Sequence, residues 1–99
     1  MKIGMYEFKG PFTIDELENL SGVYAILCDK IKNYDLIDVG ESATIKDRIN
    51  DHSRTECWIQ YCTNYKIAVH YTPNLQQHGR TEIEQNIRDK FPDIPCGDR

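Results

Sequence analysis

The sequence of 99 residues lacks a long hydrophobic run, an excess of basic residues and any repeated or low-complexity segment. Without about eighteen consecutive apolar residues, no segment is expected to span a membrane. Glycine and proline are few, at 6 and 4, and 39% of the residues are hydrophobic, which excludes a disordered chain. The formal net charge of −4 provides no global field that attracts a polyanion, so any nucleic-acid contact must use a local basic patch.

Zinc-knuckle spacing is also missing, because Cys57 and Cys62 lie five residues apart rather than in a C-x-x-C pair. Residues 1–9 contain neither an apolar core nor a cleavage pattern, so no signal peptide is expected. These absences predict a cytoplasmic protein, and the cytoplasm keeps thiols reduced. We therefore predict no structural metal and four free thiols, at Cys28, Cys57, Cys62 and Cys96.

The length predicts one domain over residues 1–99. Apolar, β-rich stretches predict three strands, over 22–28, 34–40 and 65–72. Helical spacing of apolar residues predicts helices over 43–53, 55–62 and 79–91, and a capping pattern at Thr13 and Glu16 predicts a short helix over 13–20. We expect the helices to pack through Ile45, Ile49, Ile83, Ile87 and Phe91. This order predicts an α+β domain, a small three-stranded antiparallel sheet flanked by helices.

Five polar residues stand near the predicted buried surfaces. Tyr24 ends the tripeptide Gly22-Val23-Tyr24, and Asp38 begins Asp38-Val39-Gly40 on the next strand. A hairpin symmetric about Ile31 would place Tyr24 opposite Asp38. Arg48 and His52 follow on one stripe of a helix, and Glu84 borders the apolar stripe of the last helix. Charged side chains aimed at a sheet are costly unless they are paired or line a cleft, so this set indicates a site.

These residues, in this order and spacing, resemble the GIY-YIG nuclease superfamily over about residues 22–95, with the second signature tyrosine replaced by Asp38. The resemblance implies a metal-dependent endonuclease that hydrolyses phosphodiester bonds. In it, Glu84 would hold Mg²⁺ or Mn²⁺, Arg48 would bind the phosphate, and Tyr24 would take a proton from water with His52 as a relay. Glu82 is a second candidate for the metal ligand.

The expected partner is nucleic acid, DNA rather than RNA, without any membrane contact. It would bind a basic rim made of Lys46, Arg48, Arg54, Arg80 and Arg88. The added carboxylate of Asp38 opposes phosphate binding. The alternative function is therefore a catalytically altered domain that acts as a nucleic-acid or protein interaction module.

Each of these residues also has a structural interpretation. Tyr24 and His52 would be packed side chains, and Asp38 a hydrogen-bonding strand residue. Glu84 would form an ion pair with Arg48 across the sheet, or a solvated helix pair with Arg80. The nuclease hypothesis requires Tyr24, Arg48 and Glu84 to converge.

Overall fold

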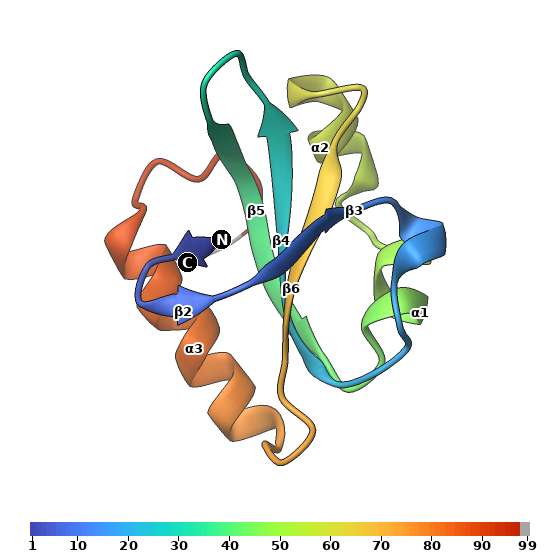
Figure 1. Cartoon of the computed structure of the whole chain (residues 1–99), viewed down its shortest axis with the longest axis vertical. Helices are drawn as coiled ribbons and strands as arrows, with labels where there is room; N and C mark the ends of the chain where they lie inside the picture. The colour runs from blue at the N-terminus through green and yellow to red at the C-terminus, as the bar shows by residue number, and fades with distance from the viewer. Residues whose placement is uncertain (98–99) are drawn as a thin grey trace.

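A four-stranded antiparallel sheet forms the centre of the protein, seen in a computed structural model that describes residues 1–97 (Figure 1). Its strand order is β3-β6-β4-β5, and its strands are β3 (Lys9–Phe12), β4 (Gly22–Asp29), β5 (Tyr34–Ser42) and β6 (Lys66–Tyr71). The helices are α1 (Ile45–Asn50), α2 (Thr55–Tyr61) and α3 (Gln77–Lys90). A separate two-stranded sheet and one 3₁₀ turn complete the fold: β1 (Lys2–Ile3), β2 (Tyr6–Glu7) and η1 (Ile14–Glu16).

The α+β class is confirmed, but the prediction of a single three-stranded sheet is wrong. The three predicted strands pair as expected, and β3 adds a fourth strand beside β6. Its sequence, Lys9-Gly10-Pro11-Phe12, contains the two residues least typical of strands, which an irregular edge strand tolerates. The helix predicted over 13–20 is only η1. The capping box of Thr13 and Glu16 is present, but the backbone becomes extended at Leu17.

The sheet buries both of its faces. On one, here called the α1/α2 face, Ile45, Ile49 and Trp58 pack on Tyr24 and Ile26. The other, here called the α3 face, is made of smaller aliphatic side chains with Ile83 and Ile87 of α3, namely Val23, Ala25, Leu27, Val39 and Ala68. The predicted packing of the four isoleucines is confirmed. Phe91 differs, because it lies at the C-cap of α3 and is 37% exposed.

The register of the β4–β5 hairpin differs from the expected one by two residues. Tyr24 lies opposite Gly40, and Asp38 lies opposite Ile26. The turn contributes one residue of the shift, because Asp29 rather than Cys28 lies opposite Tyr34, and a β-bulge at Ile37 inserts the second. A shift of two keeps every side chain on its face, so Tyr24 and Asp38 still share one surface. Gly40 is required there, because a Cβ at this position would overlap the Tyr24 phenol.

The prediction of four free thiols is wrong, because the structure contains two disulfides, Cys28–Cys62 and Cys57–Cys96. Cys62, the C-cap of α2, bonds to Cys28 in the hairpin, with a Cα–Cα distance of 5.7 Å. Cys57, within α2, bonds to Cys96 in the C-terminal segment, with a Cα–Cα distance of 6.0 Å. Disulfides are rare in cytosolic proteins, so this pairing speaks against the expected cytoplasmic location. No helix within residues 1–97 has the length and apolar character to cross a bilayer.

Candidate functional site

Asp38 occupies the centre of the candidate site, with a fully buried carboxylate. Oδ2 accepts hydrogen bonds from Arg54 Nε and Trp58 Nε1, both at 2.7 Å. Oδ1 accepts from Arg88 Nη2 and the Val39 backbone N–H, both at 2.8 Å, and from Arg54 Nη2 at 3.3 Å. A carboxylate has about four lone-pair positions, so five donors saturate it. Asp38 is therefore neither a free base nor an open metal ligand in this arrangement.

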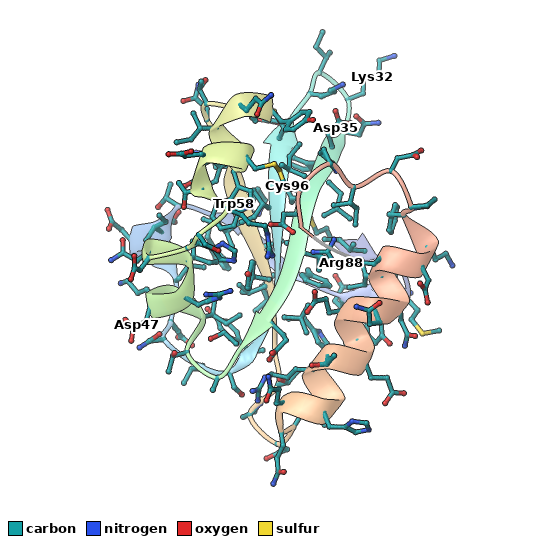
Figure 2. All side chains as sticks on the ribbon, turned by 180° about the vertical axis from the view of Figure 1, so that it is seen from behind. Lys32, Asp35, Asp47, Trp58, Arg88 and Cys96 are labelled. Carbon is teal, nitrogen blue, oxygen red and sulfur yellow. A yellow bond between two sulfur atoms is a disulfide. The ribbon has the colours of Figure 1, made fainter. Side chains whose placement is uncertain are left out.

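Arg88 reaches Asp38 from the α3 side, across the outer edge of β5. Figure 2 shows Arg88 and Trp58 on the two sides of this strand. The Arg88 guanidinium is buried and also donates to the carbonyls of Val39 and Cys96. Gly97, with φ +91°, lies against it, and a Cβ there would overlap Arg88 and Asp38. The C-terminal segment thus covers the ion pair and excludes water from it.

Tyr24 and His52 form a buried hydrogen bond between Oη and Nε2. His52 Nδ1 accepts the backbone N–H of Arg54 at 3.0 Å, so the neutral imidazole carries its proton on Nε2 and donates it to Tyr24. Burial lowers the pKa of His52 to about 4, assisted by the positive charges of Arg54 and Arg48. Burial also raises the pKa of Tyr24 to about 12, against the opposing charge of Arg54. Both groups are neutral at neutral pH.

Arg48 and Glu84 approach this pair from different elements. Arg48 is exposed on α1, and its charge acts on both Tyr24 and His52. Glu84 is half-buried on α3 and accepts a hydrogen bond from Arg88 Nε at 3.2 Å. Its charge also acts on Tyr24. The structure therefore brings Tyr24, His52, Arg48 and Glu84 into one electrostatic neighbourhood.

The predicted basic rim is only partly present. Arg80 and Arg88 are buried, and each binds a carboxylate: Arg80 Nε lies 2.7 Å from Glu41 Oε2, and Arg88 binds Asp38. Neither is at the surface, so this part of the prediction is wrong. Glu84 pairs with Arg88 rather than with Arg48 or Arg80. Three of the five predicted rim residues remain accessible, namely Lys46, Arg48 and Arg54.

Trp58 had no predicted role in the site, and Arg88 was predicted only as part of the basic rim. The Glu84–Arg88 pair follows helical i, i+4 spacing and was detectable from the sequence. The other contacts join residues far apart, such as Arg88 with Asp38 at a separation of 50. A charged residue in an apolar stretch of the sequence indicates that it has an ion-pair or hydrogen-bond partner, but the sequence does not identify that partner.

The divalent cation implied by the resemblance is compatible with Glu84. Within residues 1–97, no three His, Cys, Asp or Glu side chains group as a metal site. Mg²⁺, however, is commonly held by one or two carboxylates and several waters. Burial raises the pKa of the Glu84 carboxyl against the opposing effect of Arg88, and the charge of Glu41 adds to the rise. A half-buried carboxylate beside another has the oxygen chemistry that a hard cation neutralises, whereas Glu82 is exposed.

Comparisons with protein-family models, with curated proteins and with solved structures found no match to this chain. The resemblance therefore depends on the quoted residues alone. Any function must be argued from the geometry of Tyr24, His52, Arg48 and Glu84.

Proposed function

We propose that this domain is a metal-dependent nuclease of the GIY-YIG type, which hydrolyses phosphodiester bonds in nucleic acid, DNA rather than RNA. One observation carries the proposal: the Tyr24–His52 hydrogen bond lies within the fields of Arg48 and Glu84. Strand β4, helices α1 and α3 and the turn after α1 each contribute one of these residues. A cation and a carboxylate that both act electrostatically on one tyrosyl hydroxyl suit the recognition of a phosphodiester.

Each residue of the set has a definite task in this proposal. Arg48, the exposed guanidinium, binds the phosphate and opposes charge that builds in the transition state. Because His52 donates to Tyr24 Oη, the Tyr24 proton is directed to another acceptor, such as a phosphate or leaving oxygen. Tyr24 thus acts as a donor rather than as the base that the resemblance implies, since its pKa is about 12. Glu84 would hold a divalent cation, which supplies Lewis-acid polarisation when bound.

The nucleic acid would approach the surface of α1 and the following turn. Lys46, Arg48 and Arg54 offer positive charge there, and Asp47 and Asp51 dilute it. Only a few phosphates are contacted, so the affinity should have a shallow salt dependence. The cytoplasmic location expected from the sequence stays a proposal, and it would require the cysteines to be reduced in the cell.

The test is a nicking assay with Mg²⁺ or Mn²⁺ on plasmid DNA, single-stranded DNA and RNA, beside calorimetric metal titration. Arg48→Ala should retain metal binding and lose roughly a hundredfold or more in rate, the usual cost of losing one transition-state contact. Glu84→Gln should lose both metal binding and cleavage. Lys32→Ala, at the exposed hairpin tip, is the charge-matched control and should cleave normally (Figure 2). Wild-type protein that cleaves none of the three substrates would rule the proposal out.

A second candidate is the catalytically altered interaction module, and the burial of Tyr24, 1% exposed, favours it. In that case the surface of Lys46, Arg48 and Arg54 binds nucleic acid without cutting it. Fluorescence anisotropy with labelled DNA distinguishes the two functions. Binding that Arg48→Ala weakens, without any cleavage by wild-type protein, supports the module.

A further inference from the structure

We propose that Asp38, at the position of the second signature tyrosine, is a positioning residue that fixes the orientation and tautomer of His52 through Arg54 and Trp58. The catalytic consequence of this inference rests on the proposed nuclease function. Its structural part concerns the Tyr24–His52 hydrogen bond and stands apart from that function.

One oxygen of Asp38 binds both of the residues that hold His52. Oδ2 accepts Arg54 Nε and Trp58 Nε1, each at 2.7 Å. The same two residues touch the imidazole: the Arg54 backbone N–H donates to Nδ1, and the Trp58 ring lies 4.5 Å from the His52 ring centroid. Asp38 is therefore linked to His52 through two residues, Arg54 at the Nδ1 atom and Trp58 beside the imidazole ring.

The carboxylate is itself held rigidly from behind. Oδ1 accepts Arg88 Nη2 and the Val39 N–H, both at 2.8 Å, and Arg88 is almost completely buried. A side chain anchored by one strand and one helix can fix the turn that carries Arg54. A tyrosine has one oxygen and could not accept these donors together. An aspartate at this position can therefore hold Arg54, Trp58 and Arg88 together, which a tyrosine could not.

The tautomer decides what Tyr24 can do. With Nδ1 occupied by the Arg54 N–H, Nε2 donates and Tyr24 Oη accepts, so His52 does not take up the Tyr24 hydroxyl proton. In the other tautomer, Nε2 has a lone pair and Tyr24 must donate to it. The hydroxyl proton would then be withdrawn from the substrate. A loosened Arg54 should therefore lower the turnover rate more than substrate binding.

The decisive experiment is ¹⁵N NMR of the imidazole nitrogens of His52 in the whole chain, with kinetics measured on the same samples. Wild type should show one tautomer, with the proton on Nε2. Asp38→Asn keeps the shape but removes the charge, and should show mixed tautomers and a kcat at least about tenfold lower at a nearly unchanged KM. A single Nε2–H tautomer in folded Asp38→Asn would overturn the inference.

Trp58→Phe covers the case in which Asp38→Asn does not fold. It keeps an aromatic ring near His52 but loses the indole N–H that binds Asp38, together with one of the two fused rings. It should also increase tautomer mixing, and an unchanged His52 spectrum would count against the inference. Mixed tautomers in these variants together with an inactive wild type would support the positioning role and remove the nuclease function. Failure of the positioning role and failure of the nuclease function therefore give different results.

Discussion

The two faces of the sheet are built from alternate residues of the same strands, and they differ in kind. The α3 face consists of aliphatic side chains such as Val23, Ala25 and Val39. On the α1/α2 face, Tyr24 and Asp38 alternate with them and meet His52 and Trp58. The α3 face is mainly packing, with the Arg80–Glu41 ion pair beside it, while the other has a hydrogen-bonded network that reaches the partly exposed Arg54. The alternation of side chains along these strands thus places most of the aliphatic packing on one face and the polar contacts of Tyr24 and Asp38 on the other.

Substitutions on the two faces should also lower the free energy of unfolding by different amounts. Apolar burial is shared among many side chains, so the loss of one leaves a cavity whose cost depends on its size. The polar network depends on a single carboxylate with two arginine partners. Removing it takes a fully buried carboxylate away from Arg88, which also binds the half-buried Glu84, and breaking a buried ion pair is among the most costly changes a core can undergo.

The largest expected effect contrasts two neighbours that point to opposite faces. Asp38→Ala should lower the free energy of unfolding by about 3–5 kcal/mol, because it removes the buried carboxylate that binds both Arg54 and Arg88. Val39→Ala, next in sequence and equally buried, should cost about 1–3 kcal/mol as an aliphatic truncation. Urea denaturation of both variants measures the difference. Equal costs, or a larger one for Val39→Ala, would remove the distinction between the faces.

A smaller effect is expected from the disulfide that joins α2 to the C-terminal segment. Cys96→Ser should cost about 2–4 kcal/mol, since Cys57–Cys96 closes a loop of 39 residues. The loss should fall on the α1/α2 face, where Cys96 is buried, and be seen as faster amide exchange around Trp58. Thiol titration of the denatured, unreduced wild type should count none. Four thiols per chain would show that both cysteine pairs are reduced.

The smallest effect is a pH dependence confined to one face. The folded pKa of His52, about 4, lies below its ordinary 6.5, so its contribution to stability is complete above 6.5 and declines as the pH falls toward 4. Glu84 acts in the opposite sense, because burial raises its pKa. The comparison is therefore between wild type and His52→Gln, whose stabilities should converge as the pH falls. His78→Gln, at an exposed site, should keep the wild-type slope because His52 remains.

Much of the fold was predictable because its signals are local. Strand β4 is a nearly continuous apolar stretch, β5 and β6 are rich in β-branched and aromatic residues, and α3 has isoleucines four residues apart. Strand β3 gave no such signal, since Gly10 and Pro11 are typical of turns. The bulge at Ile37 also leaves no trace in composition, because residues 36–38 contain no glycine that would indicate a bulge.

The candidate site was predictable as a set of residues but not as a set of contacts. Tyr24, His52, Arg48 and Glu84 were all identified, because each is a polar residue on or beside a predicted apolar stretch, although Arg48 is exposed in the structure. Asp38 was identified too, but its role depends on Arg54, Trp58 and Arg88, which only the tertiary structure brings together. The cysteine pairing was missed because the prediction of free thiols depended on the absence of an export signal, and the sequence does not show which cysteines lie close together.

The interleaved disulfides also determine how far the chain can be stretched. Cys28–Cys62 and Cys57–Cys96 overlap in sequence, so the shortest covalent route from residue 28 to residue 96 passes through both bridges. That route includes about five peptide units instead of about 68, a contour of roughly 30 Å with the two bridges of 5.7 and 6.0 Å rather than roughly 230 Å at full extension. A force applied to the two ends would lengthen mainly the first 28 residues. In a pulling experiment, adding a reductant should release the remainder as one additional extension of roughly 200 Å.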